Sequence, residues 1–63
     1  MSIWEQIEET RQDLLSYSPE DYGLYSTIQE YLTAASLCAA ARQWDVALRH
    51  VMAAQDLLRL SED

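Results

Sequence analysis

Cysteine and histidine are the residue types used most often in nucleophilic and metal chemistry, and this 63-residue chain has one of each, Cys38 and His50. A cysteine nucleophile needs a neighbouring base, and nothing in the sequence places His50 beside Cys38. A zinc site needs three or four ligands at recognisable spacing. We therefore expect Cys38 to be a buried small apolar residue. We predict that the protein is not an enzyme and has no catalytic residue, metal site or cofactor.

The acidic residues are the second chemically distinctive group, with eleven acids against four arginines and a net charge of −7. Six acids gather in the first third of the chain: Glu5, Glu8, Glu9, Asp13, Glu20 and Asp21. Such a run is usually a solvated helix face. Its alternative function is to imitate a row of phosphates and block a DNA- or RNA-binding protein. The same charge argues against direct binding of nucleic acid or of an anionic membrane.

The spacing of apolar residues predicts an all-α fold of three helices in a single small domain, residues 1–63. The first helix covers about residues 3–15, and Ser2 with Glu5 forms a capping box at its start. The second and third helices are expected to form an antiparallel hairpin, with the first helix packed across it.

The second helix is predicted to cover about residues 19–42. Pro19 suits a first helical position, because the N–H that proline lacks would have no partner there. A start after Gly23 is the alternative, although one internal glycine costs a helix only about 1 kcal/mol.

The third helix is predicted to cover about residues 45–60, with Asp45 as its cap. The break before it, at residues 42–45, contains no glycine or proline. A single helix from Pro19 to Leu60 is therefore the competing interpretation, although helices of that length are uncommon in small domains.

The third helix carries more apolar surface than one contact needs. Its expected core stripe is Trp44, Ala47, Leu48, Val51, Ala54 and Leu58. A further stripe, which we call the third stripe, consists of Val46, His50, Ala53, Leu57 and Leu60. The first helix either covers the third stripe or leaves it free for a partner. His50 within it is either a partly exposed histidine or a contact that responds to protonation near neutral pH.

Partner-binding residues are predicted on this surplus apolar surface and at the start of the second helix. Tyrosines combine apolar area with a polar group, which suits interfaces. The predicted partner-binding residues are Val46, Arg49, His50, Met52, Ala53, Leu57, Leu60, Tyr22 and Tyr25.

Residues 28–60 resemble a single tetratricopeptide repeat. The aromatic and alanine positions of that family are matched by Tyr31, Trp44, Ala47 and Ala54. Ala35 and Arg42 stand at two of its glycine positions, and no proline follows Leu58. The resemblance implies protein scaffolding or chaperone-like binding. In size, charge and helix number the chain is also similar to the small acidic three-helix chaperones of bacterial secretion systems.

The size of the chain points to a partner as well. A 63-residue domain buries only about 60% of the surface that its unfolded chain exposes, and one cysteine permits no internal disulfide. We therefore expect a small acidic interaction module that acts as a homo-oligomer or within a hetero-complex. A lone cysteine, an acidic N-terminus unlike a signal peptide and the lack of a long apolar run favour the cytoplasm.

Overall fold

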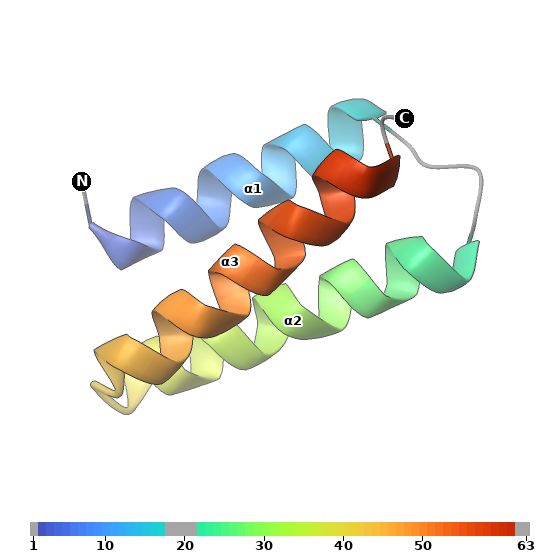
Figure 1. Ribbon diagram of the computed structural model, residues 1–63. Coiled ribbons are helices and arrows are strands. Elements are labelled where there is room, and N and C mark those ends of the chain that lie inside the picture. The colour runs from blue at the N-terminus through green and yellow to red at the C-terminus, as the bar shows by residue number, and fades with distance from the viewer. Residues whose placement is uncertain (1, 18–21, 62–63) are drawn as a thin grey trace.

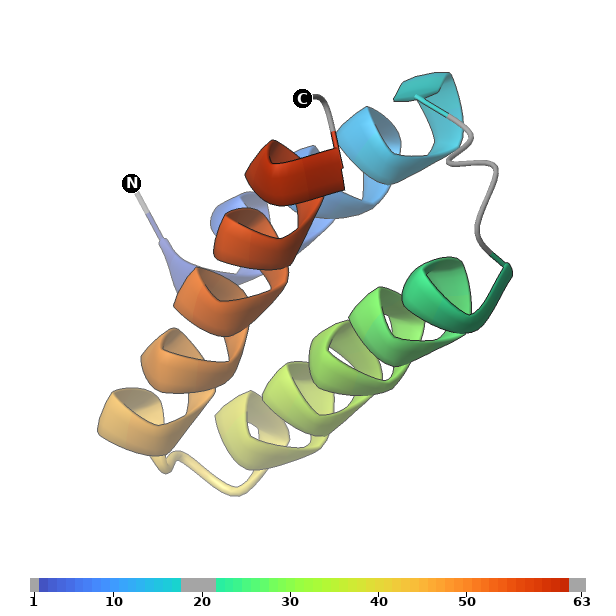
Figure 2. The same ribbon diagram turned by 45° about the vertical axis from the view of Figure 1, so that its right-hand side comes forward.

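The structure is a computed structural model that describes residues 2–17 and 22–61, and it contains three packed α-helices (Figure 1). They are α1 (Ile3–Tyr17), α2 (Tyr22–Ala40) and α3 (Trp44–Ser61). The predicted all-α fold is confirmed: α2 and α3 form the antiparallel hairpin, and α1 packs against both of them (Figure 2). In the described part of the chain, no helix combines the length and hydropathy needed to cross a bilayer.

Helix α1 begins where the capping box predicts. The backbone N–H of Glu5 donates a hydrogen bond to Ser2 Oγ over 3.2 Å, and the N–H of Gln6 donates to the Ser2 carbonyl over 3.1 Å. Ser2 therefore satisfies amide groups that have no partner inside the helix. The helix continues to Tyr17, two residues beyond the predicted end.

Helix α2 contains Gly23, so a helix that starts after this glycine is ruled out. The Thr27 hydroxyl donates to the Gly23 carbonyl over 2.9 Å inside the first turns. The predicted start at Pro19 lies outside the described residues. The helix ends at Ala40 rather than at the predicted residue 42, because the chain turns sharply after that point.

The turn between α2 and α3 is a Schellman motif with Arg42 in the left-handed conformation, at φ 62°. The N–H of Gln43 donates to the Cys38 carbonyl over 2.8 Å, and the N–H of Arg42 donates to the Ala39 carbonyl over 3.0 Å. This pair of hydrogen bonds closes the end of a helix. The alternative of one continuous helix through this region is therefore wrong.

Gln43, rather than Asp45, is the residue that precedes α3. Its carbonyl accepts the first bond of the helix, from the N–H of Ala47 over 3.0 Å. The predicted cap at Asp45 is therefore wrong, because this residue already lies in the first helical turn. Its carboxylate still suits that position, since the N-terminal end of a helix attracts negative charge.

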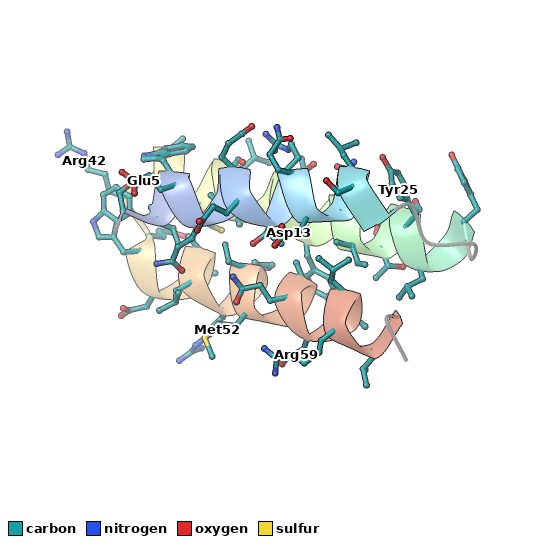
Figure 3. All side chains as sticks on the ribbon, turned by 90° about the horizontal axis from the view of Figure 1, so that it is seen from above. Glu5, Asp13, Tyr25, Arg42, Met52 and Arg59 are labelled. Carbon is teal, nitrogen blue, oxygen red and sulfur yellow. The ribbon has the colours of Figure 1, made fainter. Side chains whose placement is uncertain are left out.

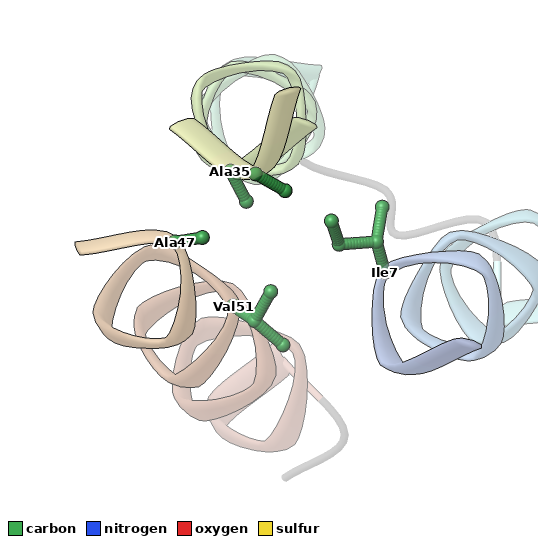
Figure 4. Close-up of a cluster of buried hydrophobic side chains, with 5 residues drawn as sticks. Ile7, Ala35, Ala47 and Val51 are labelled. Carbon is green, nitrogen blue, oxygen red and sulfur yellow. The ribbon is translucent and has the colours of Figure 1, made fainter. Parts of the chain in front are cut away.

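The core consists of two clusters, one toward each end of the bundle. The first cluster contains Ile7, Ala35, Ala39, Ala47 and Val51. The second cluster contains Leu14, Ile28, Leu32, Ala54 and Leu58. Four of these ten residues are alanines, and all four lie on α2 or α3. Small side chains allow two helices to approach closely, and Ile7 of α1 then points into the space between them (Figure 4).

Thr10 is a buried polar residue on α1. Its hydroxyl donates to the Gln6 carbonyl over 2.8 Å and accepts from Gln55 Nε2 over 3.3 Å. The second bond joins α1 to α3. Ile7 shares the first core cluster with Ala47, and Thr10 bonds to Gln55, so residue numbers increase in the same direction along α1 and α3 (Figure 1).

Replacing Arg42 by glycine should stabilise the fold. A side chain with a Cβ costs about 1–2 kcal/mol in the left-handed conformation, and part of this gain is offset by the greater freedom of glycine in the unfolded chain. We expect Arg42→Gly to add about 1 kcal/mol to the free energy of unfolding, which raises the melting temperature of a domain this size by about 4–8 °C. Thermal and urea unfolding followed by circular dichroism measures both quantities.

Arg42→Ala is the matched control, because alanine removes the charge and keeps the Cβ. It should leave the melting temperature nearly unchanged. Equal stabilisation by alanine and glycine would contradict the left-handed turn.

Candidate protein-binding surface

Most of the predicted partner-binding residues lie together on one side of α3. At about 100° per residue, an arc roughly 100° wide holds Val46, Arg49, His50, Ala53, Leu57 and Leu60. Met52 is on another side of the helix, and the two tyrosines belong to α2. The predicted set therefore does not form one surface.

The middle of the third stripe is covered by α2. The His50 ring lies 6.0 Å from the Tyr31 ring, measured between centroids, and His50 Nδ1 is 2.8 Å from the Val46 carbonyl oxygen. Leu57 is partly buried against the second core cluster. The first helix meets α3 elsewhere, at Gln55. The third stripe is thus chiefly an intramolecular contact whose two ends, Val46 and Leu60, stay exposed.

A different row of apolar side chains is exposed on α3. Trp44, Leu48 and Met52 follow one another at four-residue spacing, and 50%, 40% and 52% of their surfaces are exposed. The expectation that Trp44 and Leu48 belong to the core is wrong. Each step of four residues rotates a position by about 40° around a helix, so this row moves progressively away from the core. We call these three residues the α3 row.

The two tyrosines lie at the start of α2. Tyr22 is 80% exposed, and its ring stacks on that of Tyr25, with 6.4 Å between centroids. Tyr25 packs against the second core cluster, and its hydroxyl accepts a hydrogen bond from Gln29 Nε2 over 3.1 Å. Only Tyr22 therefore offers a large free surface.

Exposed acidic residues of α1 form a row that we call the acidic wall. Glu5, Glu9 and Asp13 are exposed and follow one another at four-residue spacing. Asp13 lies over the space between α1 and α3, whereas Met52 extends from α3 away from α1 (Figure 3). A pocket lined by Asp13, Gln55, Leu58 and Arg59 marks the end of the groove between these helices.

These three carboxylates have no cationic partner within residues 2–17 and 22–61. The ion pair found within these ranges is between Arg11 and Glu8, with 3.4 Å between Arg11 Nη1 and Glu8 Oε2. Two members of the predicted acidic run, Glu20 and Asp21, lie outside the described residues. The acidic wall is consequently free to interact with a cation from another molecule.

Cys38 and His50 both pack against neighbouring side chains. Cys38 is half-buried against the first core cluster, and His50 contacts the Tyr31 ring. Among the residues whose positions are described, no three His, Cys, Asp or Glu side chains gather as metal ligands would.

Comparison with known proteins assigns the chain to no family. No protein-family model matches it, and neither the curated proteins nor the solved structures that were compared with it give a significant match. The function must therefore be inferred from the surface itself.

The exposure of the α3 row predicts how the domain responds to two identical substitutions on one helix. Leu48→Gln should lower the free energy of unfolding by less than about 1 kcal/mol, because this side chain is already partly in water. Leu58→Gln should lower it by about 3 kcal/mol or more, because an amide is then buried in an apolar cluster. Urea unfolding of both variants provides the measurement. If Leu48→Gln were as costly as Leu58→Gln, Leu48 would be a core residue.

Proposed function

We propose that this protein is a small, non-enzymatic protein-interaction module that acts as an adaptor, assembly or chaperone-like subunit. It works as a homo-oligomer or within a hetero-complex, and α3 supplies the main contact. The observation that carries the proposal is the α3 row, three large apolar side chains exposed on consecutive helical turns.

A continuous row is more informative than isolated exposed residues. Single apolar side chains on a protein surface are normal, but a partner helix that lies in a groove typically uses anchors one turn apart. Tryptophan and methionine are also enriched in protein interfaces. The row therefore has both the composition and the spacing of a binding surface. The resemblance to a tetratricopeptide repeat implies the same kind of function, and a lone cysteine fits a cytoplasmic setting.

A second candidate function rests on the acidic wall. Glu5, Glu9 and Asp13 have no cationic partner in the described ranges, so they suit an inhibitor that occupies the basic site of a DNA- or RNA-binding protein. The two functions differ in their response to salt. At about 1 M salt the Debye length is about 3 Å, so binding through charges alone is lost, whereas binding through the α3 row persists.

The proposal is tested by capturing partners from a lysate of the native host and by measuring the mass of the purified chain. The variant Leu48→Gln/Met52→Gln removes the apolar character of the row without changing the net charge. The wild-type chain should capture a partner or form an oligomer, and this variant should reduce the association at least tenfold, because interface anchors dominate binding energy.

The matched control is Leu15→Gln/Leu37→Gln, which replaces two exposed leucines of α1 and α2. It should associate like the wild type, and circular dichroism confirms that both variants fold. A wild-type chain that stays monomeric and captures nothing would refute the proposal. Equal association by the variant and the wild type would also refute it.

A further inference from the structure

We infer that the partner that fits α3 is a second copy of this chain, bound so that the two α3 helices lie antiparallel about a two-fold axis near Met52. Arg49 of each copy then lies opposite Asp56 of the other. Asp45 of each copy lies opposite Arg59 in the same way. This inference rests on the proposed function and names the partner.

The contact surface is a side of α3 that is separate from its buried stripe. At about 100° per residue, an arc of about 100° holds six exposed residues, which we call the two-fold face: Asp45, Leu48, Arg49, Met52, Asp56 and Arg59. The buried residues of α3 lie in another arc and are Ala47, Val51, Ala54 and Leu58. Met52, near the middle of the two-fold face, extends away from α1 (Figure 3). The two-fold face is therefore open to a second helix.

The charges of the two-fold face alternate in sign along α3. Asp45 is followed by Arg49, and Asp56 is followed by Arg59, so the order of signs is minus, plus, minus, plus. The same helix read from its other end gives plus, minus, plus, minus. An antiparallel second copy therefore presents an opposite charge at each position, whereas a parallel copy presents a like charge, which opposes association.

The spacing of these residues places the opposite charges at the same level. Arg49 and Asp56 have their midpoint half a residue beyond Met52, and Asp45 and Arg59 have their midpoint at Met52 itself. One residue advances an α-helix by only about 1.5 Å, so a single two-fold axis serves both pairs. In a two-fold interface residue i meets residue j and j meets i, so each charge pair forms twice.

The four charged side chains of the two-fold face are exposed. None of them has an ion-pair partner within residues 2–17 and 22–61, where the ion pair found is between Arg11 and Glu8. The two-fold face is also neutral, with two acids and two arginines, although the whole chain carries −7. The acidic wall belongs to a different helix, α1. Charge therefore favours self-association through α3, since this surface attracts its own copy.

Met52 and Leu48 supply the apolar part of the contact. Met52 of each copy meets Met52 of the other at the axis, and Leu48 lies one helical turn away on each side. These side chains are 52% and 40% exposed in the single chain, so pairing removes apolar surface from water. The 18 residues of α3 are about 27 Å long. Such a contact is smaller than a standard interface, and small interfaces belong to weak complexes.

Two charge reversals test this arrangement. Arg49→Asp and Asp56→Arg each bring like charges together at both symmetric contacts of a homodimer, so each variant alone should dimerise at least tenfold more weakly than the wild type. An equimolar mixture of the two should form a heterodimer about as tightly as the wild type forms its homodimer, because opposite charges face each other again. The double variant Arg49→Asp/Asp56→Arg should dimerise like the wild type for the same reason. Sedimentation equilibrium from about 10 µM to 1 mM protein measures these affinities.

Arg42→Asp and Glu30→Arg are the matched controls. They change the net charge by the same amounts as the two reversals, at exposed positions outside the two-fold face. Alone and mixed, they should dimerise within about threefold of the wild type at about 0.15 M salt, where distant charges are screened. Circular dichroism verifies that every variant folds.

The inference is overturned by a wild-type chain that stays monomeric up to about 1 mM, by reversal variants that dimerise as well as the controls, or by a mixture or double variant that stays monomeric. The capture experiment separates this failure from that of the proposed function. If capture depends on Leu48 and Met52 while the purified chain stays monomeric, only the identity of the partner is wrong. If neither capture nor self-association depends on these two residues, the proposed function itself fails.

Discussion

The close contact between α2 and α3 is the interaction on which the rest of this structure depends. Alanines supply it: Ala35 and Ala39 of α2 meet Ala47 of α3 in the first core cluster, and the left-handed turn at Arg42 reverses the chain between them. Small side chains bring the two backbones together and leave little volume to fill. Ile7 of α1 then completes the buried part of this cluster (Figure 4), and Ile3 packs against it.

Because the core is narrow, several large apolar side chains of α3 lie outside it. The helix buries a thin stripe through Ala47, Val51 and the positions that follow, and the α3 row lies beyond the edge of that stripe. The large apolar side chains of α3 are therefore not all required for folding.

The helices and their pairing could be predicted from the sequence because local signals fix them. Ser2 caps α1 as its spacing with Glu5 indicates, and periodic apolar residues identify the hairpin. The inner and outer faces of α3 could not be separated, because Trp44 and Leu48 continue the four-residue spacing of the core. The exposure of both side chains in the packed domain shows that this row is outside.

The turn and the wall show a second limit of sequence reasoning. Left-handed geometry at Arg42 has no local marker, since glycine is the residue usually found there. The position of the acidic wall relative to the α3 row depends on which sides of α1 and α3 face each other, and the contact between these helices joins residues far apart in the chain. Sequence alone could therefore not show how the charged and apolar surfaces are arranged.

The exposure of Trp44 in the free chain is the most direct test of this account. In a Trp4→Phe variant at micromolar concentration, acrylamide should quench the Trp44 fluorescence about half as efficiently as free indole, in keeping with the 50% exposure of this side chain. A monomer in which Trp44 is fully protected from acrylamide would contradict the account, because Trp44 would then be part of the core.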